Sequence, residues 1–253
     1  MSVLTVAVRP QEFALLAADG VSTDPRTGAV HQYLEKIKIY PSLSCAIGVT
    51  GMGKLDTMID LFMPESVQEF DHLVEFLPGM VRYAQNQMIE SGRLMCDDIR
   101  SNVVAAGWSS RAQEFKAYRV LTYPKGSQNA ETGETVTLEP WVAHEMQPYG
   151  TWTSSAPHPE AWESCGLDQE RDGEDEGATL TRIVCAGRQS SGKIFQDEAD
   201  YPYNAGGFVQ LALVNQGHCR TWITHRWPED VIGEPIDPTR GVILPAHLTE
   251  DEG

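Results

Sequence analysis

The feature that most constrains the fold is a change of hydrophobic pattern, from strand-like to helix-like, within the first 62 residues. Residues 3–8 and 13–19 read as two mostly apolar strands joined by a turn at residues 9–12, which predicts a β-hairpin. Residues 36–40 then alternate between apolar and polar, and residues 43–49 form another apolar strand. Four strands in so short a stretch indicate a sheet-rich domain rather than a helical bundle.

Beyond the glycine-containing turn at residues 50–53, the apolar side chains recur at the spacing of one helix face. This spacing predicts a helix as far as Phe62, ended by Pro64. A second helix is expected over residues 67–91, with an interruption at Pro78-Gly79.

The rest of the chain returns to strands, with one more helix between them. A loop or irregular hairpin is expected at residues 20–30, and a long polar excursion at 124–150 has the length of an insertion or functional loop. Strands are predicted at 102–108, 115–121, 151–155, 208–214 and 220–224, and a helix at 179–188. Two sheets packed face to face, with the helices outside, would bury this pattern.

We therefore expect one domain over residues 1–227, with an insertion near 124–150. Residues 228–253 are rich in proline and acidic residues and are expected to form an extended C-terminal arm.

Composition excludes several classes of function. The net charge is −17 and no Lys/Arg cluster occurs, which disfavours nucleic-acid binding. No apolar run is long enough to span a bilayer, and residues 1–6 lack the basic and apolar regions of a secretory signal, so no membrane association is expected. The five cysteines are widely spaced without a C-x-x-C pair, which fits a reducing, cytoplasmic compartment.

Metal and cofactor sites are not expected. The acidic segment 168–176 is similar to the start of a calcium loop, but its twelfth position is Thr179 where a bidentate Glu is needed, so a solvated acidic loop is the preferred reading. The histidines and cysteines do not form a spaced ligand set.

Several short motifs follow one another in a defined order. Ala17-Ala18-Asp19 ends the second strand, Glu35-Lys36-Ile37 opens the next pair, residues 48–53 (Gly-Val-Thr-Gly-Met-Gly) lead into a helix, and Asn204-Ala205-Gly206-Gly207 opens a late strand. This combination resembles the proteasome β subunits and related bacterial peptidase subunits, which are N-terminal-nucleophile (Ntn) hydrolases. The resemblance covers about the first quarter of the chain, and only the order of its pieces is specific. It implies an α+β fold, a four-layer αββα sandwich with two antiparallel sheets between helix layers.

The resemblance also implies a chemistry. In this family the hydroxyl of the first residue is the nucleophile and its own α-amino group is the base. By resemblance, Lys36 would activate the hydroxyl and Asp19 would hold that lysine charged. A backbone N–H at Gly51 or a neighbour would stabilise the oxyanion, a contribution of about 3 kcal/mol for one well-placed donor.

The nucleophile implied by this scheme is Ser2, exposed by removal of Met1. Its register requires one extra residue in the turn at 9–12, and Thr5 is less suitable because cleavage would fall inside a strand. Ser154 or Ser155 would fill the position of the family's helper serine. The family's later Asp and Ser helpers have no counterpart in residues 201–205.

Each of these residues also has a structural reading. Ser2 would be an ordinary terminus, Lys36 a surface lysine, Asp19 a turn cap before Gly20, and Gly51 part of a strand-to-helix junction.

Three functions therefore stay open. The first is a peptidase or amidohydrolase acting on peptides. The second is an inactive member of the same fold, a homo-oligomer or a subunit of a larger assembly such as a bacteriophage virion or tail. The third is another α/β protein whose resemblance is accidental.

Overall fold

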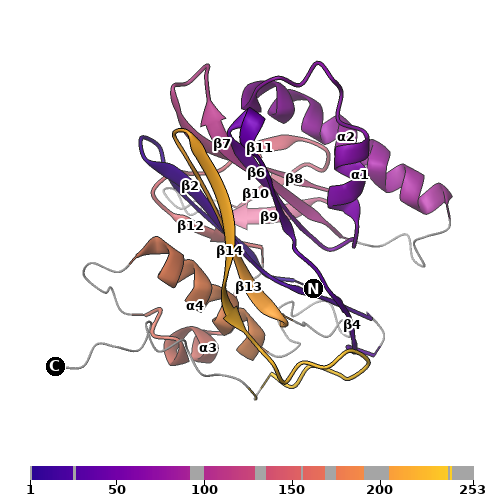
Figure 1. Ribbon diagram of the computed structural model, residues 1–253, viewed down its shortest axis with the longest axis vertical. Coiled ribbons are helices and arrows are strands. Elements are labelled where there is room, and N and C mark those ends of the chain that lie inside the picture. Colours follow the sequence, from indigo (N-terminus) through magenta and orange to yellow (C-terminus); the bar gives the residue numbers. More distant parts are fainter. Residues whose placement is uncertain are drawn as a thin grey trace.

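A computed structural model describes residues 2–24, 27–91, 100–128, 135–154, 156–168, 175–190, 205–238 and 240. Within this part of the chain the fold is mixed α/β and contains two five-stranded sheets in which every strand pair is antiparallel (Figure 1). The first sheet has the order β12 (Thr151–Thr153), β1 (Leu4–Arg9), β2 (Phe13–Asp19), β13 (Phe208–Asn215) and β14 (His218–Arg226). The second has the order β11 (Ala143–Glu145), β8 (Glu114–Leu121), β7 (Asn102–Ser109), β6 (Cys45–Thr50) and β5 (Ile37–Tyr40). The expected mixture of helices with antiparallel sheets is confirmed.

The remaining elements are short hairpins and helices around these sheets. Two-stranded sheets pair β3 (Val21–Thr23) with β4 (Val30–Tyr33), and β9 (Lys125–Gln128) with β10 (Thr135–Leu138). The described α-helices are α1 (Leu55–Leu61), α2 (Phe70–Glu90), α3 (Pro159–Ser164) and α4 (Glu176–Gln189), and a 3-10 turn (η1, Pro41–Leu43) precedes β6.

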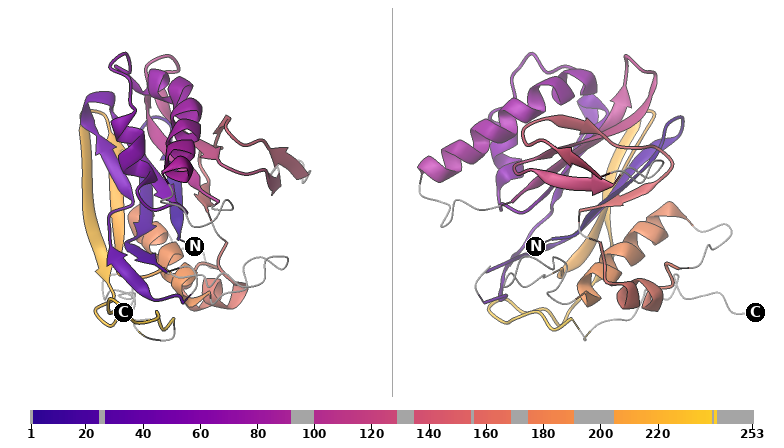
Figure 2. Two further views of the ribbon diagram at one scale, coloured as in Figure 1. Left: turned by 90° about the vertical axis from the view of Figure 1, so that its right-hand side faces the viewer. Right: turned by 180° about the vertical axis from the view of Figure 1, so that it is seen from behind.

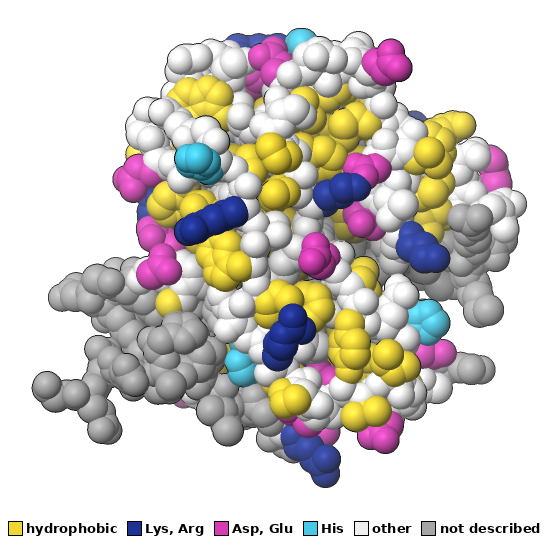
Figure 3. Space-filling view, in the orientation of Figure 1, with side chains coloured by type: hydrophobic (Ala, Val, Ile, Leu, Met, Phe, Trp, Pro, Cys, Tyr) yellow, Lys and Arg dark blue, Asp and Glu magenta, His cyan; other side chains and the backbone are white. Residues whose placement is uncertain are grey.

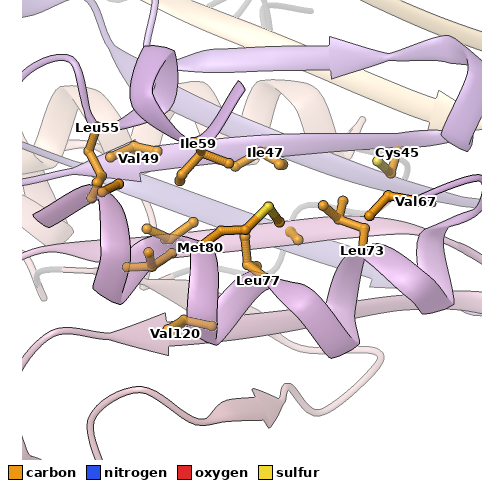
Figure 4. Close-up of a cluster of buried hydrophobic side chains, with 14 of the residues drawn as sticks. Cys45, Ile47, Val49, Leu55, Ile59, Val67, Leu73, Leu77, Met80 and Val120 are labelled. Carbon is orange, nitrogen blue, oxygen red and sulfur yellow. The ribbon is translucent and has the colours of Figure 1, made fainter. Parts of the chain in front are cut away.

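Three hydrophobic clusters bury the faces of the two large sheets. Residues of both sheets share one cluster, which includes Leu4, Leu16, Val104 and Phe115. Helices α1 and α2 pack on the second sheet, with Leu55 and Leu77 against its side chains (Figure 4). Helices α3 and α4 pack on the first sheet, where Leu180, Ile183 and Val184 meet residues of β2 and β13. The two pairs of helices lie at opposite ends of the molecule in Figure 1, and Figure 2 shows the β9–β10 hairpin projecting from it.

The predicted interruption of the second helix is wrong. Helix α2 runs unbroken from Phe70 to Glu90 with Pro78 inside it. Pro78 and Gly79 lie on the partly exposed and exposed side of the helix, while Leu77, Met80 and Val81 are buried. The backbone acceptor that loses its donor at Pro78 therefore lies where water can replace it, and burial of the apolar face maintains the helix.

Two segments without clear periodicity acquire structure from their neighbours. Strands β3 and β4 form the irregular hairpin, with a register shift between Ser22 and Thr23. Within the excursion at 124–150, β9 and β10 form a separate hairpin, and β11 returns to pair with the edge of β8. Helix α3 carries no signal that the sequence analysis used, because its six residues are too few for a periodic pattern.

The described part of the C-terminal arm packs on the domain. Bridges join Ala29 to Pro235 and Val30 to Ile232, and Asp230 is buried in an ion pair with Arg188. Residues 241–253 lie outside the described part of the chain.

Charged side chains of both signs are scattered over the face shown in Figure 3, where Lys and Arg are separated by acidic, apolar and uncharged groups. None of the described helices is both long and apolar enough to cross a membrane.

Candidate active site

Ser2, Lys36 and Asp19 meet at the end of the β1–β2 hairpin. The Lys36 ammonium donates to Ser2 Oγ at 2.6 Å and to Asp19 Oδ2 at 2.7 Å. Asp19 is fully buried and Lys36 is 6% exposed. The pair therefore has little access to water, and its geometry is fixed by the protein.

The antiparallel register of β1 and β2 places Asp19 opposite Val3. The Val3 N–H donates to Asp19 Oδ1 at 2.9 Å, and the Asp19 N–H donates to the Val3 carbonyl at 3.3 Å. Residues 10–12 form the turn between the paired residues Arg9 and Phe13. Ser2, one residue before Val3, is thereby brought to the lysine.

Strand β13 supports both members of the ion pair from the other side. The Gly206 N–H, just before this strand, donates to Asp19 Oδ2 at 3.4 Å. Gln210 Oε1 accepts from the backbone N–H groups of Lys36 and Ile37, each at 3.0 Å, and its Nε2 donates to the Ile37 carbonyl at 2.8 Å. Gln210 was not among the residues predicted for the site; its signal in the sequence is a single amide side chain inside the apolar run of residues 208–214.

Burial governs the ionisation of Lys36. Removal from water lowers the pKa of its ammonium group below 10.5, while the charge and hydrogen bond of Asp19 oppose this shift. A lysine with a lowered pKa loses its proton more readily and can exchange a proton with the hydroxyl it contacts.

Ser154 connects the start of β1 to the segment after β12. Its Oγ accepts from the Leu4 N–H at 3.0 Å and donates to the Ser2 carbonyl at 3.2 Å. Of the two serines considered for a helper role, Ser154 thus lies at Ser2, whereas Ser155 is outside the described residues.

Gly51 lies in the turn after β6, two residues beyond Val49. The Val49 N–H donates to the Lys36 carbonyl at 2.9 Å. Gly51 has a φ of +98°, and a Cβ on it would lie 2.2 Å from the Arg100 carbonyl oxygen, so only glycine fits. Among the described residues no hydrogen bond joins Gly51 to Ser2. The structure therefore places Gly51 near the lysine's backbone, without direct contact to the serine.

Other candidates from the sequence are not in reach of this chemistry. Thr5 is fully buried within β1 and its hydroxyl donates to the Trp152 carbonyl at 2.7 Å. Met1 and residues 201–204 lie outside the described part of the chain, as do residues 169–174 of the acidic segment. Within the described ranges, no group of three or more His, Cys, Asp or Glu side chains could hold a metal ion.

No protein-family model matches this chain. No curated protein matches it in sequence either.

Proposed function

We propose that the chain is an Ntn hydrolase of the proteasome-β type, a peptidase or amidohydrolase that uses Ser2 as nucleophile after removal of Met1. The observation that carries the proposal is the contact of Ser2 Oγ with Lys36 Nζ at 2.6 Å. The same Nζ also contacts the buried Asp19 Oδ2 at 2.7 Å. A lysine cation that a carboxylate holds beside the hydroxyl stabilises the oxygen when the α-amine takes its proton.

The proposed reaction has two halves. With Met1 removed, the Ser2 hydroxyl attacks the substrate's carbonyl carbon while its proton passes to the α-amine, and Lys36 stabilises the oxygen as it becomes nucleophilic. N–H groups of the turn at Gly51 stabilise the oxyanion. The amide C–N bond breaks as the departing amine takes the proton, which leaves an ester on Ser2. Water then hydrolyses this ester and restores the hydroxyl.

The arrangement of layers supports the proposed family. Two antiparallel sheets share a core cluster, and each also carries helices on its other face. A four-layer αββα sandwich with the nucleophile on the first strand of one sheet fits this arrangement. We propose a cytoplasmic location, because Cys45, Cys165, Cys185 and Cys219 are free thiols, as is usual in a reducing compartment.

The test uses the mass of the intact protein and a hydroxyl-directed acylating probe. We expect a mass that lacks methionine, and addition of one acyl group from a β-lactone to the wild type. Ser2→Ala should lose both this addition and the turnover of a fluorogenic peptide-amide library. Ser66→Ala, at an exposed serine, should retain both. Quantitative retention of Met1, or acylation that persists in Ser2→Ala, would sink the proposed mechanism.

A second candidate is a non-catalytic structural or assembly subunit, either in a homo-oligomer or in a larger complex such as a phage particle. The observation that favours it is the set of exposed apolar side chains on the projecting excursion, Val136, Val142 and Tyr149. Light scattering of the purified chain separates the candidates. A stable assembly together with retained Met1 would favour the structural role over the enzyme.

A further inference from the structure

Two cations, Arg119 and Lys125, lie close enough to influence each other's charge, next to the candidate active site. Arg119 Nη2 donates to Ser127 Oγ at 3.0 Å, and its guanidinium lies 5.5 Å from the centre of the Trp152 ring. Lys125 Nζ donates to the Ser154 carbonyl at 3.2 Å. Neither cation has a carboxylate partner among the described residues, although the chain carries 36 acidic residues.

The pair is connected to Ser2 through Ser154. The residue that accepts from Lys125 with its carbonyl is the same one whose hydroxyl donates to the Ser2 carbonyl at 3.2 Å. The ring of Trp152 faces the Arg119 guanidinium, and Trp152 pairs with Val6 in the neighbouring strand β1. The cations therefore lie close to strand β1, whose first residue, Leu4, follows Ser2 by two positions.

The same group of residues also reaches toward the turn at Gly51. Arg100, whose carbonyl oxygen excludes a side chain at Gly51, places its guanidinium 5.2 Å from the centre of the Tyr123 ring. Burial raises the pKa of the Tyr123 hydroxyl, while a hydrogen bond with Asn102 and the charges of Arg100 and Arg119 oppose this shift. The Arg100 guanidinium therefore lies near Tyr123, while its backbone lies at the turn of Gly51.

Both cations are poorly satisfied. Arg119 Nε is buried without a hydrogen-bond partner in the described structure. Burial lowers the pKa of Lys125, and the neighbouring charge of Arg119 lowers it further. Two like charges that are partly removed from water repel each other, and a buried donor without a partner costs free energy. An anion bound between Arg119 and Lys125 would reduce both costs.

We propose that Arg119 and Lys125 form an anion subsite that binds a carboxylate group of the amide substrate hydrolysed at Ser2. The amide part of this statement rests on the proposed function, whereas the carboxylate binding does not. A planar guanidinium matches a carboxylate with two parallel hydrogen bonds, and the lysine adds a point charge. The subsite would select substrates with an acidic side chain or a terminal carboxylate near the scissile bond.

Calorimetry on the full chain tests binding without turnover. The probes are N-acetylglutamate α-amide, which has one carboxylate, and N-acetylglutamine α-amide, which has none, each titrated into the Ser2→Ala variant at low salt. We expect only the first to bind. Addition of Lys125→Gln should weaken its binding by about ten- to a hundredfold, the range for a hydrogen bond between charged groups. Lys116→Gln removes a cation that lies on the strand of Arg119 (β8) and pairs with Glu145, and it should leave binding unchanged.

A second measurement separates the subsite from the chemistry. Two fluorogenic peptides that differ only by Glu or Gln beside the scissile amide are compared in the wild type, Lys125→Gln and Arg119→Lys. We expect a preference for Glu in kcat/KM that falls about tenfold or more in Lys125→Gln. Arg119→Lys keeps the charge but loses the two-pronged contact, so the preference should fall there as well.

The outcomes distinguish the two proposals. Carboxylate-selective binding that depends on Lys125, without turnover of either peptide, would support the subsite and count against the hydrolase. Equal affinity for both amides, or a loss in Lys125→Gln that is the same for both, would overturn the subsite even if Ser2 is acylated. If Arg119→Lys fails to fold, Lys125→Gln alone decides, because its side chain ends at a carbonyl oxygen rather than in the core.

Discussion

Replacing Asp19 by asparagine removes the charge that faces a buried lysine, and the structure sets the size of the effect. Lys36 Nζ and Asp19 Oδ2 are 2.7 Å apart, with side chains 6% and 0% exposed. Loss of one partner of such a pair typically costs about 3–5 kcal/mol. The variant can limit this cost if Lys36 is deprotonated in the folded state, because a neutral amine is less costly to bury than an ammonium group.

The free energy needed to deprotonate Lys36 depends on pH. It is about 1.36 kcal/mol for each pH unit below the ordinary lysine pKa, which is 10.5. The largest loss of stability that the missing charge can cause is therefore about 4.8 kcal/mol at pH 7 and about 2 kcal/mol at pH 9. The unfolded variant binds a proton that the folded variant lacks, so stability rises with pH until 10.5 is reached. In the wild type this rise is smaller, because Asp19 raises the pKa of Lys36 back toward its ordinary value.

Urea denaturation at pH 7, 8 and 9 and constant ionic strength measures the effect. We expect Asp19→Asn to lose about 3–5 kcal/mol at pH 7 and at least 1 kcal/mol less at pH 9. The matched control is Glu145→Gln, which breaks the more exposed pair with Lys116 and should cost about 1 kcal/mol or less at each pH. A loss that is the same at pH 7 and pH 9 would refute the reasoning, because Lys36 would then not respond to its burial.

Two further perturbations test the supports of the site. Asp230→Asn should cost about 3–5 kcal/mol in urea denaturation, because it breaks the contacts at 2.8 and 2.9 Å with buried Arg188; an unchanged midpoint would show that the arm adds nothing to stability. Gly51→Ala should lower stability by about 1–3 kcal/mol in thermal unfolding, since its φ is +98° and its Cβ would meet a carbonyl oxygen. Gly53→Ala, whose Cβ would have nothing within 4 Å, is the control, and equal shifts in both would contradict the steric argument.

The elements that the sequence predicted well are those whose signal is local. The hairpin of β1 and β2 and the change to helix α1 follow from side-chain periodicity within a dozen residues. The interruption predicted at Pro78 was wrong, because proline's local effect is outweighed by burial of the helix's apolar face. Helix α3 was missed because its six residues are too few to show a helical repeat of apolar side chains. The hairpin β9–β10 lies in a polar excursion, where β9 (Lys-Gly-Ser-Gln) has no apolar side chain and only the four residues of β10 alternate.

The site divides in the same way. Lys36 and Asp19 were selected by order in the chain, and the structure brings both to Ser2, while their catalytic roles stay predictions. Gln210 and Ser154 reach the site from 174 and 150 residues away, through strand pairing that no local pattern encodes. A polar residue inside an apolar strand is the one local sign of such a partner.

The Lys36–Asp19 pair itself argues for chemistry rather than architecture. The neighbours of the pair in the chain, Ala18 and Ile37, belong to an apolar cluster shared by the two sheets. At a buried position of this kind a hydrophobic pair of similar volume is often at least as stable as an ion pair. The fold instead supplies Gln210, the Val3 N–H and the Gly206 N–H to hold two charges in place, and the lysine uses its remaining reach on a serine hydroxyl. The proposed hydrolase would use this buried cation beside the Ser2 hydroxyl, whereas a purely structural role does not call for it. The burial of Lys36 is therefore the strongest reason to look for turnover at Ser2 first.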